Sequence, residues 1–166
     1  MLEVKELSCG YGNDTIVKNV SFSVKDGEIL SITGPNGCGK TTLLRALCGI
    51  IPYKSGSALI GGKEIRSMSR EELSANAALL SQTGAGGEYS DFTVRETVAL
   101  GRYAKSKGFG SDKADEAAAE EYMKKTDTLP IADSIITELS GGQLQRVLLA
   151  RAFAQEPKII FLDEPA

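Results

Sequence analysis

Apolar and polar residues alternate in two stretches near the start of the chain. LEVKEL begins at residue 2, and SFSV occupies residues 21–24. Alternation with a period of two turns one face of a strand to a core and the other to water, so both stretches are predicted to be half-buried antiparallel strands. SALIGGKEI, further along, predicts a hairpin that turns at Gly61 and Gly62, because glycine accepts the positive φ angles of tight turns.

Three further apolar stretches indicate strands. EILSIT at residues 28–33 is a short apolar run before a glycine-rich stretch, and ALLSQ at residues 78–82 ends in a polar residue. KIIFL at residues 158–162 shows no alternation after its first residue. A continuous apolar run is typical of a parallel strand covered on both faces, so residues 158–162 are predicted to be such a strand.

Helical patterns occupy much of the remaining sequence. TTLLRALCGI at residues 41–50 predicts a helix, and residues 111–126 begin acidic and end basic, which suits the helix dipole. Two capping boxes are predicted, Ser69 with Glu72 and Thr93 with Glu96. TGAGGEYSD at residues 83–91 predicts a glycine-rich loop. The interval 83–138 is therefore expected to be a mostly helical insertion between two α/β halves.

Composition narrows the class of protein. The chain has 166 residues, 42% hydrophobic and 25% charged, which is ordinary for one soluble globular domain. No apolar run approaches the roughly 18 residues of a membrane span, and nothing at the N-terminus resembles a secretory signal. The net charge of −3 argues against nucleic acid as the main partner. The three cysteines show no spacing pattern and are expected to be reduced thiols in a cytosolic setting.

Residues 34–42 (GPNGCGKTT) carry the first chemical motif. Gly34, Gly39, Lys40 and Thr41 match the pattern G-x-x-x-x-G-K-[ST], between a predicted strand and a predicted helix. The glycines let backbone N–H groups surround a phosphate, the lysine neutralises it, and the threonine hydroxyl ligates Mg²⁺. The motif therefore predicts binding of the β- and γ-phosphates of a nucleotide, most simply MgATP. The remaining predicted contacts in this loop are Asn36, Gly37, Cys38 and Thr42.

Cys38 has two interpretations. It lies inside the phosphate loop, so alkylation of its thiol is expected to block nucleotide binding, and ATP is expected to protect it. Alternatively, it is a small filler at a variable loop position.

Two carboxylates, Asp163 and Glu164, follow the predicted parallel strand directly. Ligands of open α/β sheets lie outside the carboxyl ends of the strands. Asp163 is therefore predicted to hold Mg²⁺, and Glu164 to polarise the attacking water as general base. The alternative is a solvated acidic pair before a turn at Pro165.

The stretch LSGGQLQR supplies a second helix start. Ser140 and Gln143 have capping-box spacing, yet Gly141 and Gly142 each cost roughly 1 kcal/mol against alanine in a helix. Glycines are useful at this position if a second anion approaches the helix N-terminus closely. We therefore predict a dimer in which each nucleotide lies between the phosphate loop of one copy and this turn of the other.

The phosphate loop, LSGGQ and FLDEP in this order resemble the nucleotide-binding domain of ABC transporters. The resemblance implies a P-loop NTPase α/β core with an N-terminal antiparallel β subdomain and an inserted helical subdomain. It divides the chain into residues 1–82 (β subdomain and P-loop core), 83–138 (helical subdomain) and 139–166 (signature helix and Walker B strand). It also implies that Tyr11 stacks on adenine with Val17 on the same face, and that Gln82 contacts Mg²⁺ or the attacking water.

MSREELSANAALLSQ and FTVRETVALGRY resemble, more narrowly, the ATPase subunits of importers for iron–siderophore complexes, haem and cobalamin. This resemblance implies a homodimer or paired ATPase subunit that binds two ATP, membrane permease partners, an indirect link to a substrate-binding protein, and a place in the cytoplasm on the inner face of the membrane. The glycine-rich stretch after Gln82 departs from that pattern, in the region where the permease is expected to dock.

The resemblance also implies elements beyond Ala166, namely a D-loop and a switch histidine, whereas the sequence holds no histidine. The chain is expected to be about the first two-thirds of such a domain, with an open strand edge, lowered stability and a tendency to associate. Two alternatives stay open: a module that binds ATP without hydrolysing it, and a soluble ABC ATPase of repair or translation.

Overall fold

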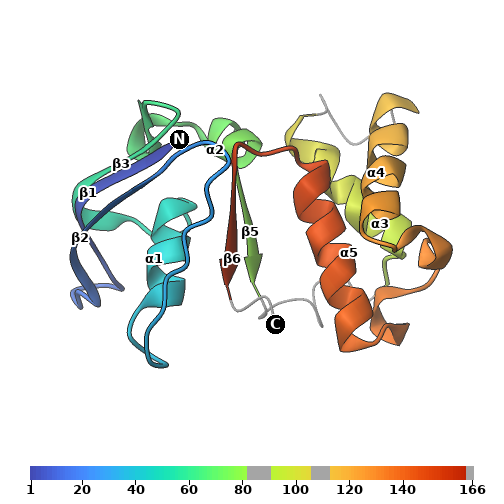
Figure 1. Cartoon of the computed structure of the whole chain (residues 1–166), viewed down its shortest axis with the longest axis horizontal. Helices are drawn as coiled ribbons and strands as arrows, with labels where there is room; N and C mark the ends of the chain where they lie inside the picture. Colours follow the sequence, from blue (N-terminus) through green and yellow to red (C-terminus); the bar gives the residue numbers. More distant parts are fainter. Residues whose placement is uncertain (82–90, 106–112, 164–166) are drawn as a thin grey trace. The chain divides into compact units, whose positions relative to one another are not determined.

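The computed structural model describes residues 1–81, 91–105 and 113–163 (Figure 1). These residues form two compact units. One unit comprises residues 1–79 together with 158–163, and the other lies within residues 80–157.

A four-stranded antiparallel sheet in the order β2-β1-β3-β4 belongs to the first unit. Its strands are β1 (Leu2–Cys9), β2 (Val17–Val24), β3 (Tyr53–Ile60) and β4 (Lys63–Glu64). The two strands predicted from alternation are confirmed, although β2 begins four residues earlier than its alternating stretch. Gly61 and Gly62 make the predicted hairpin turn, with φ angles of 58° and 82° that favour glycine.

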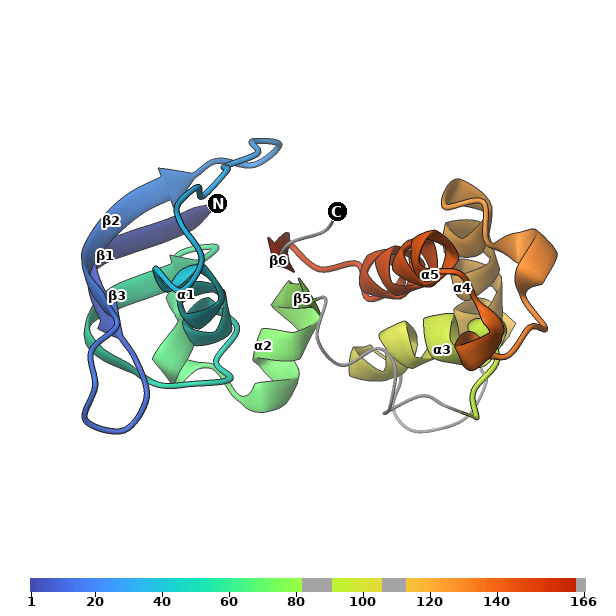
Figure 2. The same cartoon turned by 90° about the horizontal axis from the view of Figure 1, so that it is seen from below.

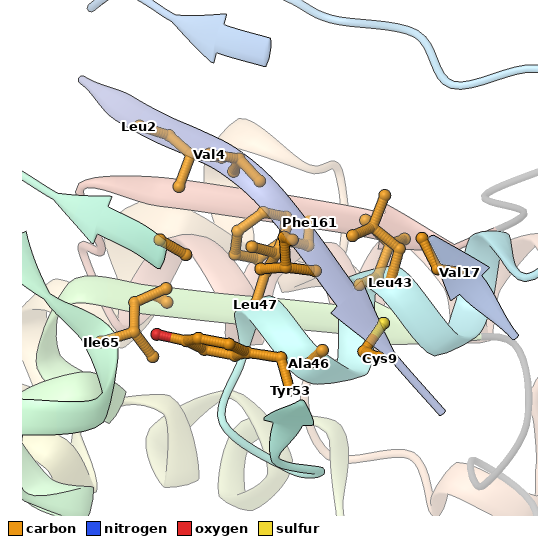
Figure 3. Close-up of a cluster of buried hydrophobic side chains, with 14 of the residues drawn as sticks. Leu2, Val4, Cys9, Val17, Leu43, Ala46, Leu47, Tyr53, Ile65 and Phe161 are labelled. Atoms are coloured by element: carbon orange, nitrogen blue, oxygen red, sulfur yellow. The ribbon is translucent and has the colours of Figure 1, made fainter. Parts of the chain in front are cut away.

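Helix α1 (Lys40–Leu47) lies between this sheet and strand β6 (Ile159–Asp163) (Figures 1 and 2). Five of its eight residues are buried, and the four apolar ones among them pack with apolar residues of β1, β3 and β6 into one core (Figure 3). Leu47 and Leu2 of that core are 0% and 2% exposed. The core therefore fixes the direction in which the start of α1 points.

Strand β6 forms a two-stranded sheet with β5 (Ala77–Ser81), and the two arrows point the same way in Figure 1. The strands predicted near residues 78–82 and 158–162 are thus confirmed, apart from Gln82, which lies outside the described residues. Coverage of β6 on both faces is wrong for one position, because Leu162 is 45% exposed.

The predicted strand at residues 28–33 is not formed. Within the described part of the chain this segment pairs with no strand, and Ile29 is 95% exposed. A strand requires a neighbour that accepts and donates its backbone hydrogen bonds. Residues 28–33 have the apolar composition of a strand but lack that neighbour among the described residues.

Helix α2 (Arg70–Asn76) follows the 3₁₀ turn η1 (Ile65–Ser67) in the first unit. Ser69 caps it by accepting a hydrogen bond from the backbone N–H of Glu72, as predicted. The reciprocal half of the capping box is not formed, because the Glu72 carboxylate pairs with Lys63 Nζ at 2.6 Å.

The second unit is mainly helical. Its elements are α3 (Val94–Ala99), η2 (Leu100–Ala104), α4 (Lys113–Lys125), η3 (Leu129–Ile131), η4 (Ile136–Glu138) and α5 (Gly141–Ala154). Helices α3, α4 and α5 share an apolar core that includes Val98, Met123 and Val147, all 0% exposed. Both predicted capping boxes that start helices here, at Thr93 and Ser140, are complete. None of the helices among the described residues has the length and apolarity needed to cross a bilayer.

Arg102 connects three of these elements. Its Nε lies 2.9 Å from Asp115 Oδ1 on α4, and its Nη1 donates to the carbonyl of Ala154 at 2.9 Å and lies 3.2 Å from Glu156 Oε1. The Lys105 and Arg102 cations hold the pKa of Glu156 below its usual range. This cluster fixes the end of α5 against the rest of the helical unit.

Candidate nucleotide-binding site

The loop before α1 has the shape of a phosphate cradle. Gly37 and Gly39 adopt φ angles of 79° and 103°, so the chain turns sharply where the motif places its glycines. Lys40 Nζ donates to the carbonyls of Gly34 and Pro35 at 2.8 and 3.1 Å. The ammonium group thus lies inside the loop, at the position from which it can neutralise a bound phosphate.

The loop between β1 and β2 packs against this cradle. A Cβ atom on Gly39 would lie 2.8 Å from Val17 Cγ2 and 3.0 Å from Ile16 Cγ2, so only glycine fits beside them. Val17 is buried at 8% exposure, whereas Ile16 is 41% exposed. Val17 therefore supports the cradle from the core side. Ile16, which belongs to no sequence motif, is the exposed apolar side chain beside it.

The side chains of Thr41 and Asp163, the two predicted Mg²⁺ ligands, meet at the first turn of α1. Thr41 Oγ1 donates to Asp163 Oδ1 at 3.0 Å, and Asp163 is 8% exposed. The two residues are 122 positions apart in the sequence. They meet because the end of β6 lies beside the first turn of α1. Hydroxyl and carboxylate oxygens suit Mg²⁺, which usually takes one or two protein ligands and keeps water and phosphate oxygens for the rest. The pair fits that ion.

Tyr11 lies in the β1–β2 loop, and its side chain is anchored from α1. Arg45 Nη1 donates a hydrogen bond to the Tyr11 hydroxyl at 3.2 Å, and Tyr11 remains 43% exposed. Arg45 was not singled out by sequence reasoning, because its partner is 34 residues away and no local pattern connects them. Thr42, in contrast, is buried at 7% exposure.

The glycines of the LSGGQ turn have open space around them. Ser140 Oγ accepts from the Gln143 backbone N–H, and Gln143 Oε1 accepts from the Ser140 N–H at 2.9 Å. A Cβ atom on Gly141 or Gly142 would meet no atom within 4 Å among the described residues. The packing of the described residues therefore gives no reason for glycine at either position.

Two predicted site residues, Gln82 and Glu164, lie outside the described residues. Their roles rest on the sequence alone. Among the residues that are described, no cluster of three or more cysteine or acidic side chains converges as a metal site.

The family model described as ABC transporter matches residues 17–166. The uncharacterized ABC transporter ATP-binding protein YvrA of Bacillus subtilis is 44% identical over 166 residues, 99% of this chain and 37% of that protein. The ferric enterobactin transport ATP-binding protein FepC of Escherichia coli is 38% identical over 165 residues, 99% of this chain and 60% of that protein. The chain thus spans between about a third and three-fifths of these relatives.

Among solved structures, the fold is similar to the dimeric ATP-binding cassette MJ0796 in a post-hydrolysis state bound to ADP and Pi. The TM-score is 0.83 at 29% identity, over all of this chain and 75% of that one. The antiparallel sheet, phosphate loop and helical part described above are those of the ABC ATPase fold. Because the family model covers residues 17–166, the chain belongs to the ABC transporter ATP-binding family.

Proposed function

We propose that this chain binds MgATP at residues 34–41 and, as a pair of copies, hydrolyses it to drive solute import through a membrane permease. The observation that carries the proposal is the Thr41–Asp163 pair beside the cradle that contains Lys40. Two oxygen ligands and one ammonium group then lie at the N-terminus of α1, where the helix dipole favours phosphate.

Positioning and electrostatics supply most of the catalysis in phosphoryl transfer. Lys40 exchanges its two loop carbonyls for the β- and γ-phosphates of the nucleotide, and Thr41 and Asp163 hold Mg²⁺, which neutralises developing charge on the phosphates. We assign Glu164 the role of general base toward the attacking water and Gln82 a contact with that water or the ion. Tyr11 stacks on the adenine base.

A second copy completes the site in this proposal. The open space around Gly141 and Gly142 supports the approach of a nucleotide held by the other copy's phosphate loop. The capping box at Ser140 already satisfies one backbone N–H of α5, which leaves the glycine N–H groups to donate to the γ-phosphate. MJ0796, to which this fold is similar, is a dimeric cassette bound to ADP and Pi, which supports the pairing of two copies.

Iron–siderophore, haem or cobalamin complexes are the cargo we propose, and the inner face of the cell membrane is the proposed location. The similarity to a ferric enterobactin transport protein supports this class of cargo. Permease subunits are the proposed membrane partners.

Steady-state hydrolysis of MgATP by the chain, measured beside ATP affinity, tests the proposal. A general base contributes typically 10²–10⁴-fold, so Glu164→Gln is expected to lower turnover by about that factor while ATP still binds. The same variant is expected to dimerise with ATP in sedimentation, because it retains nucleotide that the wild type releases.

The outcomes separate the alternatives. Unchanged turnover in Glu164→Gln removes Glu164 from the proposed role. ATP binding by the wild type without turnover makes the chain a binding module. An absence of ATP binding by folded protein contradicts the proposal as a whole.

A further inference from the structure

Helix α1 leaves three polar positions outside the core. Thr42, Leu43, Leu44, Ala46 and Leu47 are buried. Lys40, Thr41 and Arg45 remain. Thr41 and Arg45 are four residues apart, so their side chains lie on the same side of the helix, about 5–6 Å apart at Cβ. The side of α1 that carries the proposed Mg²⁺ ligand therefore continues by one turn to Arg45.

The backbone of Arg45 is fixed at the end of α1, and its side chain hydrogen-bonds to Tyr11, whose side chain is not part of the core. The carbonyl of Arg45 accepts the N–H of Ile50 at 2.9 Å in the turn that ends α1. Its Nη1 donates to the Tyr11 hydroxyl at 3.2 Å, whereas Tyr11 is 43% exposed. Of the interactions described for the Tyr11 side chain, this hydrogen bond is the one that joins it to the helix of the phosphate loop.

The backbone of the Tyr11 loop is also held in place. Ile16 N donates to the Cys9 carbonyl at 3.0 Å, and Asp14 N donates to the Tyr11 carbonyl at 2.9 Å. Ile16 and Val17 pack against Gly39. These contacts hold the backbone of the loop in place. The Tyr11 ring could still rotate, and the hydrogen bond from Arg45 restrains that rotation.

We propose that Arg45 is a positioning residue for the nucleotide base, which acts through Tyr11. This inference rests on the proposed function, since it assumes a purine nucleotide at the phosphate loop. An exposed aromatic side chain loses rotamer freedom when a ligand stacks on it, and a chain ordered in advance avoids part of that loss. Arg45 orders the ring through the hydroxyl at its edge, while the Tyr11 residue stays 43% exposed.

Dissociation constants for MgATP and for magnesium tripolyphosphate, which has no base, test this inference. They are measured on the wild type, Arg45→Met, Tyr11→Phe and the double variant. Arg70→Met is the matched control, because it removes one exposed cation from α2 in the same unit. Thermal melts confirm that each variant is folded, and an ionic strength of about 0.15 M shortens the Debye length to about 8 Å.

Arg45→Met and Tyr11→Phe are each expected to weaken ATP binding by about two- to tenfold, the equivalent of one hydrogen bond. The double variant is expected to bind ATP as weakly as either single variant, because both remove the same interaction. The affinity for tripolyphosphate is expected to be unchanged in all variants. The control Arg70→Met is expected to bind both ATP and tripolyphosphate as the wild type does.

Several results overturn the inference. Additive losses mean that Arg45 acts on the nucleotide directly rather than through Tyr11. Equal weakening of tripolyphosphate means that its charge alone matters, and unchanged ATP affinity means that the hydrogen bond contributes nothing. If the wild type binds tripolyphosphate and ATP equally, the base is not recognised and this inference fails while the phosphate site stands. If the folded wild type binds neither, the proposed function fails as well.

Discussion

Gly39 is where the shape of the phosphate loop depends most directly on packing against its neighbours. Its φ angle is 103°, and an added Cβ atom would lie 2.8 Å from Val17 Cγ2. Gly37, two residues earlier, has a φ angle of 79° and open space around its Cα. Alanine at Gly37 therefore meets backbone strain alone, whereas alanine at Gly39 meets strain and a steric clash.

The two costs differ in size. Left-handed backbone costs a non-glycine residue roughly 1–2 kcal/mol. Carbon atoms pack best at about 3.5–4.0 Å, and forcing an extra methyl group into a packed site typically costs about 1–3 kcal/mol. Val17 is stiff and buried, so it has little room to move. Gly37→Ala is thus expected to lower the free energy of unfolding by about 1–2 kcal/mol and Gly39→Ala by about 2–5 kcal/mol.

Urea unfolding followed by circular dichroism measures both variants against the wild type, with the slope m as a check that the unfolded states are comparable. ATP affinity is expected to fall further in Gly39→Ala, because the clash moves the cradle. Equal losses of stability in the two variants would refute the packing of the β1–β2 loop against the phosphate loop.

Three further predictions concern other parts of the chain. Thr97 Oγ1 is buried with no hydrogen-bond partner in the described structure, so Thr97→Val is expected to raise the free energy of unfolding by about 1 kcal/mol, and a loss in urea unfolding would count against it. Burial, with the Glu64 carboxylate, raises the pKa of Tyr53 to about 12 from an ordinary value near 10. The pKa is higher in the folded state, so the stability that Tyr53 contributes is present below pH 10 and lost as the pH rises toward 12. Between these pH values the free energy of unfolding should fall less in Tyr53→Phe than in the wild type. Cys38 is exposed and Cys9 is buried, so iodoacetamide is expected to modify Cys38 first and abolish ATP binding, and MgATP is expected to slow the modification, as mass spectrometry would show.

The elements that depend only on residues close together in the chain could be predicted from local sequence patterns. The turn at Gly61 and Gly62 and the caps at Thr93 and Ser140 each depend on a few consecutive residues, and the structure contains all of them. The two alternating strands are also confirmed, because one apolar face per strand is enough to define which side meets the core.

Contacts between distant residues account for what the sequence did not predict. Residues 28–33 have a strand's composition, but pairing depends on a neighbour, and none lies beside them in the described part of the chain. The hydrogen bond between Arg45 and Tyr11 and the packing of Ile16 on Gly39 likewise join segments that no motif relates. The Thr41–Asp163 contact was accessible to prediction, since both residues belong to motifs whose chemistry requires a shared ion.

Calorimetric titration of MgATP into the chain, with Lys40→Ala beside the wild type, tests the central claim most directly. Hydrogen bonds to charged groups contribute about 1.5–3 kcal/mol, so the substitution is expected to weaken a saturable, one-to-one interaction by roughly tenfold or more. Folded wild-type protein that shows no saturable binding, or the same affinity in both proteins, would contradict the assignment of residues 34–41 as a nucleotide site.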